Sequence, residues 1–323
     1  MKAIVLGCGL VGELIARDLA KDENFQVTVA DIDEKKLEKL AKEAGIQGIR
    51  TDLSNSSDIK KIVADKDIVI GAVPGFLGFN MLRSVIEAGK NIVDISFMAE
   101  DTLSLNELAK KKGVTAVIDM GVAPGMSHMI VGYVNSLLDE TESATIQIGT
   151  LEAFNTDGLR SLLYTIKIPS MKEKTLRYPG YTEKMRMLRE TGFFSDIPIE
   201  VGGAKVNPID VTSKLLFSKW KLKEDEGEFT VMRIIVQGKK EEKRLCYTYD
   251  LLDYYDKNEK ATSISRTTGF PCAIMARIIA QGEYSRKGVS PPEYIGREYK
   301  VYRKVMNELE KRDVFYKENI VEI

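Results

Sequence analysis

Residues 3–12, Ala-Ile-Val-Leu-Gly-Cys-Gly-Leu-Val-Gly, decide the fold of this 323-residue chain. The apolar run at 3–6 predicts a buried parallel strand, and the helical spacing of leucines over 10–20 predicts a helix directly after it. Between them, Gly7-x-Gly9-x-x-Gly12 has the spacing of a dinucleotide-binding turn. Gly7 allows the tight turn, Gly9 lets a pyrophosphate approach the backbone, and Gly12 lets the helix pack on the strand. The free N–H groups at the helix start are suited to phosphates.

An acidic residue follows at the distance this turn requires. Asp31 comes 19 residues after Gly12, at the end of a second apolar run over 26–30. Its carboxylate can accept both ribose hydroxyls of NAD, whereas the 2′-phosphate of NADP would meet a like charge. Two unit charges about 4 Å apart repel by roughly 4 kcal/mol at an effective dielectric of about 20. Lys35 and Lys36 soften this repulsion, but the sequence still predicts NAD as cofactor.

The pattern of apolar runs changes along the chain. Up to about residue 125 strands and helices alternate, which predicts an α/β fold, a Rossmann doubly wound parallel sheet. The predicted strands there are 3–6, 26–30, 67–72, 91–95 and 115–119, and the predicted helices 10–20, 34–44, 80–88 and 103–112. Later segments predict an α+β domain whose antiparallel sheet has one face covered. Its predicted strands are 145–149, 229–237 and 244–251, and its helices 127–138, 182–190, 272–281 and 297–312.

Ligands of an open parallel sheet bind beyond the carboxyl ends of its strands. Asp52, after the third strand position, either meets the adenine or caps the next helix. The loop at 72–77 is expected to run along the cofactor toward the nicotinamide. The predicted cofactor-binding residues are Gly7, Gly9, Leu10, Val11, Gly12, Asp31, Ile32, Asp52, Leu53, Ala72, Val73, Pro74 and Ser96.

Composition excludes several classes of protein. The 47 basic and 48 acidic residues give a net charge of -1, so no global field draws the chain to nucleic acid or to an anionic membrane. No apolar stretch reaches the roughly 18 residues of a membrane span, and no signal peptide is evident. The three cysteines lack metal or disulfide spacing, which predicts reduced thiols in a cytoplasmic protein without a metal. The single histidine, His128, is expected to have a structural or capping role.

Six stretches carry a resemblance to a known family. They are Ala-Val-Pro-Gly-Phe-Leu-Gly-Phe at 72–79, Val-Asp-Ile-Ser-Phe at 93–97, Asp-Met-Gly-Val-Ala-Pro-Gly-Met-Ser at 119–127, Glu-Ala-Phe-Asn-Thr-Asp-Gly-Leu-Arg at 152–160, Thr-Leu-Arg-Tyr-Pro-Gly at 175–180 and Ser-Arg-Thr-Thr-Gly-Phe at 265–270. In these the chain resembles the saccharopine dehydrogenase (saccharopine reductase) family, and most closely its L-lysine 6-dehydrogenase branch. The likeness covers nearly the whole chain.

The resemblance implies a division of the chain and an activity. It implies a Rossmann domain at 1–125, an α+β substrate and dimerisation domain at 126–288, and a C-terminal helix at 289–323 that returns to the first domain. It also implies a homodimer, and hydride transfer from an amine-bearing carbon to NAD(P). We expect oxidation of the side-chain amine of L-lysine. The alternatives are a saccharopine- or carboxynorspermidine-type reductase and a regulator that binds NAD without catalysis.

Two features depart from the family. Relatives usually have Asn where this chain has His128. They also carry some tens of residues, including a Gly-Gly-Leu-Pro turn, between the segments that here meet at Gly149 and Thr150. Either the lineage lost that segment, or the chain is interrupted between these two residues.

Amine oxidation needs a proton acceptor, because only the neutral amine can release a hydride. Asp94 and Asp119 end predicted strands and are candidates, with helix capping as the alternative for each. An arginine fork suits an α-carboxylate, and the candidates are Arg160, Arg177 and Arg266, with Arg177 preferred and a structural salt bridge the alternative for each. Two aromatic residues, Phe97 and Phe154, either wall the nicotinamide or an aliphatic chain, or pack in the core.

Overall fold

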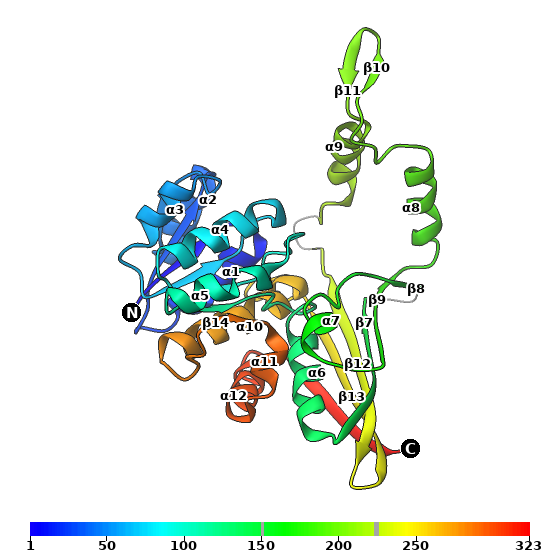
Figure 1. Cartoon of the computed structure of the whole chain (residues 1–323). Coiled ribbons are helices and arrows are strands. Elements are labelled where there is room, and N and C mark those ends of the chain that lie inside the picture. Colours follow the sequence, from blue (N-terminus) through cyan, green and yellow to red (C-terminus); the bar gives the residue numbers. More distant parts are fainter. Residues whose placement is uncertain (150–151, 223–225) are drawn as a thin grey trace.

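The structure is a computed structural model that describes residues 1–149, 152–222 and 226–323. Figure 1 shows a layered N-terminal part, a second sheet beside it, and an arm that projects away from both. The interruption predicted between Gly149 and Thr150 lies outside the described residues. The predicted fold class, a Rossmann sheet with a second α+β domain, is confirmed.

The first sheet has seven parallel strands in the order β14-β6-β5-β4-β1-β2-β3. These strands are β1 Lys2–Leu6, β2 Gln26–Asp31, β3 Gln47–Arg50, β4 Ile68–Gly71, β5 Ile92–Asp94, β6 Thr115–Val117 and β14 Gly288–Ser290. The helices between them are α1 Leu10–Ala20, α2 Glu34–Ala44, α3 Ser56–Val63, α4 Gly75–Glu87 and α5 Asn106–Lys111, with a 3-10 turn η1 Thr102–Leu105.

Alternation along β1 divides the apolar core between the two faces of this sheet. Ala3 and Val5 join α1 and α2 in one cluster, while Ile4 and Leu6 join α3, α4 and α5 in the other. The first cluster also contains apolar residues of the second sheet, so one continuous core links the two sheets.

The second sheet has six strands in the order β15-β13-β12-β7-β9-β8. They are β7 Glu140–Ile148, β8 Glu152–Asn155, β9 Ser170–Arg177, β12 Phe229–Lys240, β13 Lys243–Tyr254 and β15 Tyr316–Glu322. The prediction of an antiparallel sheet needs correction, because β7 and β9 pair in parallel. The connection from β7 to β9 contains β8, which is antiparallel to β9, and the short helix α7 Leu162–Thr165, so β9 enters the sheet in the same direction as β7.

One helix packs on the second sheet, and another lies between the two sheets. These are α6 Met126–Leu137 and α10 Ser263–Ala280, and α10 contacts α1, β4 and β5 on one side and β12 and β13 on the other. The last helices, α11 Pro292–Gly296 and α12 Tyr299–Glu310, pack on α6 and α10.

The sheets divide the chain differently from the predicted boundaries at two places. β14 begins at the end of the predicted second domain but forms the edge of the first sheet, beside β6. β15 belongs to the predicted C-terminal part but pairs with β13 in the second sheet. A contact of the C-terminal part with the first domain does exist, since Arg312 forms an ion pair with Asp18 of α1 at 2.9 Å. The division into three parts itself stays a prediction.

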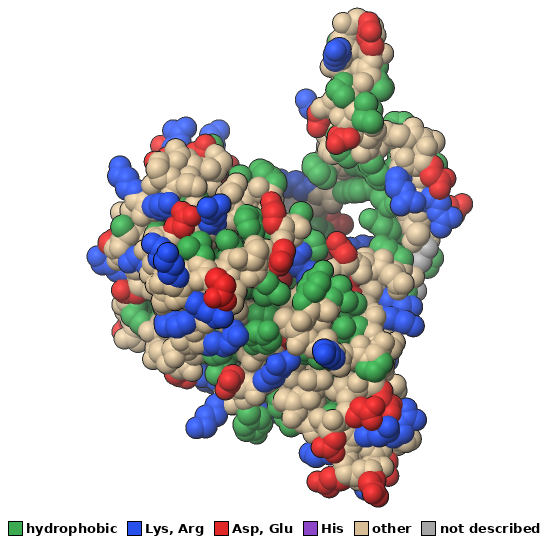
Figure 2. Space-filling model, viewed as in Figure 1, with side chains coloured by type: hydrophobic (Ala, Val, Ile, Leu, Met, Phe, Trp, Pro, Cys, Tyr) green, Lys and Arg blue, Asp and Glu red, His purple; other side chains and the backbone are tan. Residues whose placement is uncertain are grey.

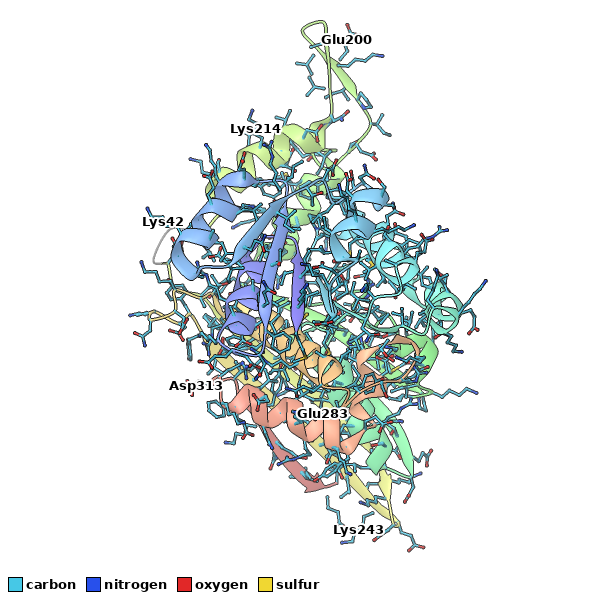
Figure 3. All side chains as sticks on the ribbon, turned by 90° about the vertical axis from the view of Figure 1, so that its left-hand side faces the viewer. Lys42, Glu200, Lys214, Lys243, Glu283 and Asp313 are labelled. Carbon is cyan, nitrogen blue, oxygen red and sulfur yellow. The ribbon has the colours of Figure 1, made fainter. Side chains whose placement is uncertain are left out.

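The arm consists of α8 Tyr181–Glu190, the hairpin β10 Ile199–Val201 with β11 Ala204–Val206, and α9 Pro208–Trp220. Figure 3 shows Glu200 at its tip, at the opposite end of the molecule from Lys243. No side chain of α8 is buried, and Thr212 is the buried one in α9. Large apolar side chains of the arm are therefore in contact with solvent (Figure 2).

Several predicted elements have different limits. α4 begins at Gly75 with Pro74 as its N-cap, so the expected loop at 72–77 is half helix. α10 begins at Ser263 and contains Pro271, whereas the prediction began the helix after that proline. The predicted helix at 103–112 is split into η1 and α5, and β7 begins five residues before the predicted strand.

Candidate functional site

The glycine turn after β1 is packed too closely for any side chain at two of its positions. Gly7 has φ +110°, and a Cβ there would lie 2.3 Å from the carbonyl oxygen of Ala72. A Cβ on Gly12 would lie 2.1 Å from the carbonyl oxygen of Gly7. Gly9, in contrast, faces open space, and no side chain caps α1. The first N–H groups of α1 are therefore available to a phosphate.

Asp31 is held beneath this turn at the end of β2. Its Oδ2 accepts a hydrogen bond from the backbone N–H of Cys8 at 2.6 Å, and its Oδ1 accepts one from Asp33 at 2.9 Å. These bonds fix the carboxylate beside the glycine turn. Burial raises the pKa of the Cys8 thiol to about 11, so Cys8 stays protonated here.

A cavity of about 680 Å³ extends from the glycine turn along the carboxyl ends of the strands. All thirteen predicted cofactor-binding residues line it. Six further residues line it, of which Phe76 and Leu77 lie in the loop expected along the cofactor and Phe97 is the aromatic residue that was a candidate for the nicotinamide wall. The other three, Lys36, Ser54 and Ile95, were not predicted to bind the cofactor. Ile32 and Phe76 are 64% and 79% exposed, which leaves apolar surface for a flat ring.

Of the two interpretations of Asp52, the helix cap is wrong. Asn55 is the N-cap of α3, and its side chain accepts from the Ser57 N–H at 2.9 Å. Asp52 accepts from the Ser54 N–H at 2.9 Å, which lowers the pKa of its carboxyl. It lines the 680 Å³ cavity.

A second cavity, of about 390 Å³, lies between the two sheets and shares Phe97 with the first. The first domain contributes Phe97, Val122 and Ala123 to it, and strands of the second sheet contribute Ile148, Thr175 and Thr230. Among the described residues that line it, the charged ones are three acids and one base: Asp157, Glu173, Glu228 and Arg177. Of the candidate arginines, Arg177 lines this cavity, as preferred from the sequence, and its guanidinium lies 5.8 Å from the ring centre of Tyr181.

Asp119 and Arg160 form a buried ion pair beside a third cavity of about 460 Å³. Nε of Arg160 lies 3.0 Å from Oδ2 of Asp119, and the guanidinium also donates to the Met98 carbonyl at 2.8 Å and lies 4.4 Å from the ring centre of Phe97. Both residues have positive φ, 53° and 38°, which is uncommon outside glycine. Burial raises the pKa of Asp119, and Arg160 opposes that shift.

Asp94, the last residue of β5, is completely buried. It accepts from the backbone N–H of Ser96 at 2.8 Å and lies 3.0 Å from the Ser96 hydroxyl. Burial raises the pKa of Asp94 well above its ordinary value. Asp94 therefore lies behind Ser96 and is not among the described residues that line the cavities, whereas Asp119 lines the third one.

The remaining candidates lie elsewhere. Arg266 is buried in α10 and forms ion pairs with Asp253 at 3.3 Å and Asp256 at 3.0 Å. The geometry therefore supports a structural salt bridge for Arg266 rather than binding of a substrate carboxylate. Arg266 borders a different hollow, formed with α1 and α12. Phe154 stacks on Tyr181 of the arm, with ring centres 6.2 Å apart, rather than on the dinucleotide cavity.

The capping role expected for His128 is confirmed. The residue is fully buried in the first turn of α6, where Nδ1 accepts from the N–H of Gly125 at 3.2 Å. Nε2 lies 3.1 Å from the carbonyl oxygen of Leu159 and donates to it. Burial lowers the pKa of His128, so the folded protein holds it neutral.

Replacing His128 with asparagine is expected to flatten the stability profile below neutral pH. The pKa of His128 is lower in the folded protein than in the unfolded chain, where it is about 6.5. Neutral His128 therefore stabilises the fold fully above about pH 6.5, and this stabilisation is lost as the pH falls through the folded-state pKa. Uptake of one proton limits the slope to about 1.4 kcal/mol per pH unit. Because His128 is the one histidine of the chain, urea unfolding of both proteins at pH 7.5 and 5.5 isolates its effect. If the free energy of unfolding falls equally in the wild type and the variant between pH 7.5 and 5.5, His128 is not the buried neutral group that we assign.

The acids of the second cavity were not among the site residues predicted from the sequence. Glu173 lies between Lys172 and Lys174, which looks like a solvated strand, and Glu228 precedes a predicted strand without any motif. Asp157 lies within the stretch at 152–160 that carries the family resemblance, so it alone of the three acids had a signal in the sequence. Among the described residues no three ligands are grouped to hold a metal ion, and none of the helices is long and apolar enough to cross a bilayer.

A parallel sheet, an uncapped helix after a glycine turn and a cavity along the strand ends define a Rossmann-type dinucleotide-binding protein with a second α+β domain. Residues 134–314 match the family model of the saccharopine dehydrogenase C-terminal domain, and residues 3–117 that of the saccharopine dehydrogenase NADP binding domain. The chain belongs to the saccharopine dehydrogenase family. Its first domain is one that binds a nicotinamide dinucleotide.

Curated relatives match over parts of their length. Saccharopine dehydrogenase [NADP(+), L-glutamate-forming] of Saccharomyces cerevisiae is 29% identical over 151 residues, 47% of this chain and 32% of the relative. The mitochondrial alpha-aminoadipic semialdehyde synthase of Bos taurus is 25% identical over 130 residues, 40% of this chain and 14% of the relative. The chain thus spans a third or less of the curated relatives it matches.

Apo saccharopine dehydrogenase (L-Glu forming) from Saccharomyces cerevisiae has a similar solved structure. The TM-score is 0.79 at 18% identity, and the match covers 99% of both chains. At this identity the likeness shows the fold alone.

Proposed function

We propose that this chain is an NAD-dependent oxidoreductase that oxidises the side-chain amine of a free amino acid, with L-lysine as the favoured substrate. The observation that carries the proposal is the second cavity, which places three carboxylates and one guanidinium next to the wall of the dinucleotide cavity. The bound dinucleotide would supply a hydride acceptor at its nicotinamide ring.

The first cavity has the groups that a dinucleotide needs. The open backbone at Gly9 and the uncapped start of α1 suit the pyrophosphate, and Asp31 suits the ribose hydroxyls. The exposed apolar side chains of Ile32 and Phe76 suit the adenine. Phe97, shared by both cavities, would lie where nicotinamide and substrate meet.

The charges of the second cavity favour lysine over saccharopine. Lysine carries two ammonium groups and one carboxylate, which complements the three acids and Arg177. Saccharopine carries three carboxylates, two of which would lie among like charges. Oxidation transfers a hydride from the carbon that bears the amine to the nicotinamide and releases a proton, which leaves an imine. Water then hydrolyses the imine to an aldehyde with release of ammonia, and the α-amine can cyclise onto the aldehyde with loss of water.

Asp119 is the candidate proton acceptor that the geometry favours. It borders the third cavity, and its partner Arg160 lies against Phe97 of the second cavity, whereas Asp94 is completely buried behind Ser96. The raised pKa of Asp119 makes its carboxylate a stronger base. Arg160 would then keep Asp119 ionised and orient it. We assign the carboxylate of the amino acid to Arg177.

The alternative is a saccharopine-type reductase, which the names of the relatives favour. The test offers purified protein with lysine, with saccharopine, and with lysine plus 2-oxoglutarate and reduced cofactor, in separate mixtures followed at the nicotinamide absorbance. Reduction of NAD by lysine alone is the expected result. Turnover that requires saccharopine or the oxo acid would establish the alternative, and dinucleotide binding without turnover would indicate a regulator.

We also propose a homodimer. The arm exposes Leu215, Phe217 and Trp220 by 63%, 68% and 55%, an apolar surface that calls for a partner. A second copy of the chain is the expected partner, and light scattering is expected to give twice the monomer mass. A monomer mass at micromolar concentrations would contradict the proposal. Cytoplasmic location stays a prediction.

A further inference from the structure

Alternation along β9 directs three consecutive same-face residues into the second cavity. Glu173, Thr175 and Arg177 all line it, while the residues between them do not. The strand therefore presents an acid at one end of the cavity and a base at the other. Four residues of strand separate their Cα atoms by about 13 Å.

Glu173 is a buried carboxylate whose charge has no partner in the protein. It is 6% exposed, and its Oε2 accepts hydrogen bonds from the Thr156 hydroxyl and from the Gly158 N–H at 3.0 Å. Within the described ranges, no hydrogen bond reaches Oε1 and no cation lies within ion-pair distance. A buried charge without a counter-charge is costly unless a ligand supplies one.

Close packing fixes Glu173 in this position. A Cβ on Gly158 would lie 2.5 Å from Oε1 and 2.6 Å from Oε2, so glycine there lets the backbone wrap around the carboxylate. The hydroxyl of Thr175 lies 3.2 Å from that of Thr156, which extends the polar support along the cavity wall. The carboxylate is thus held in one orientation before any ligand binds.

The other two acids of the cavity are differently placed. Asp157 is exposed to solvent, which screens its charge. Glu228 is half-buried and accepts from the N–H of Ile264 at 3.0 Å, and burial raises the pKa of its carboxyl. Glu173 therefore offers a deeply buried and pre-oriented acceptor.

We infer that Glu173 is the receptor for the side-chain ammonium of the substrate, with Arg177 receiving the carboxylate at the other end of β9. This inference rests on the proposed function and names its specificity-determining residue. The span between the two charges accommodates an aliphatic chain of a few methylenes. The ligand class is an α-amino acid with a terminal ammonium, and an isosteric apolar amino acid would leave Glu173 unpaired.

The test is a binding measurement that needs no turnover. L-lysine and L-norleucine, which has the same carbon chain without the side-chain ammonium, are titrated calorimetrically into the purified protein saturated with NADH. The wild type is expected to prefer lysine, and Glu173→Gln to reduce that preference by about 10- to 100-fold, the worth of a charge-assisted hydrogen bond. Norleucine and NADH affinities are expected to stay unchanged. Glu140→Gln, at an exposed site in β7, is the matched control.

The outcomes separate this inference from the proposed function. If Glu173→Gln does not fold, Glu173→Asp takes its place. Aspartate keeps the charge but is shorter by one methylene, so a smaller loss of the preference for lysine over norleucine is expected. An unchanged preference in the variant overturns the inference even if lysine reduces NAD. If the preference for lysine over norleucine depends on Glu173 but no amino acid is turned over, the inference is supported and the proposed dehydrogenase activity is refuted. Failure of the wild type to prefer lysine overturns the inference directly.

Discussion

Replacing Asp31 with serine is expected to raise the preference for NADP over NAD by about a hundred- to a thousandfold. The carboxylate is fixed beside the glycine turn by the Cys8 N–H, where it repels a 2′-phosphate by roughly 4 kcal/mol at about 4 Å. Serine removes that charge and also one acceptor for the ribose hydroxyls of NAD. The measurement is the dissociation constant of each reduced dinucleotide, from quenching of protein fluorescence.

A neighbouring acid serves as the control for this variant. Asp33 caps α2, and its side chain accepts from the N–H groups of Lys35 and Lys36. It does not line the dinucleotide cavity. Asp33→Ser is expected to leave the ratio of the two dissociation constants unchanged, because serine can still cap the helix. If Asp31→Ser also leaves the ratio unchanged, Asp31 does not select the cofactor.

Replacing Arg160 with methionine is expected to lower the free energy of unfolding by about 3 to 5 kcal/mol. The side chains of Arg160 and Asp119 are only 14% and 3% exposed, so the variant leaves a buried carboxylate without its counter-charge. Urea unfolding at pH 7 measures the loss. Adding Asp119→Leu to the variant is expected to recover part of it, since no unpaired charge then remains.

An exposed pair gives the matched control. Arg233 donates to Asp250 at 2.6 Å and 3.0 Å, but these side chains are 56% and 40% exposed. Solvent screening limits such a pair to about 1 kcal/mol or less, so Arg233→Met is expected to have a small effect. Similar losses in both variants would show that burial of the Asp119 pair contributes little.

Local signals made the first domain predictable. The helices predicted at 10–20 and 34–44 have those limits in the structure. For the second of these helices the signals are strong, with Asp33 as N-cap and Gly45 in the left-handed conformation at its end. The predicted cofactor-binding residues line one cavity for the same reason, because a glycine turn and strand ends bring them together by topology alone.

Interactions between distant segments were not predictable in the same way. The parallel pairing of β7 with β9 depends on a crossover that leaves no mark in the pattern of apolar residues. Arg266 lies in a stretch with glycine and threonine that resembled a ligand-binding loop, yet its partners Asp253 and Asp256 come from another element. Glu173 becomes distinctive only through burial, which its lysine neighbours in the sequence conceal.

The position of β14 and β15 in the chain bears on how the protein is made. Each forms an edge of a different sheet, beside β6 and β13 respectively. A nascent chain that has emerged only as far as about residue 285 therefore has two strands with unpaired backbone groups, one in each half of the molecule. Unpaired edges of this kind recruit other strands. β6 and β13 therefore obtain these partners only after residues 288–290 and 316–322 have been added to the chain.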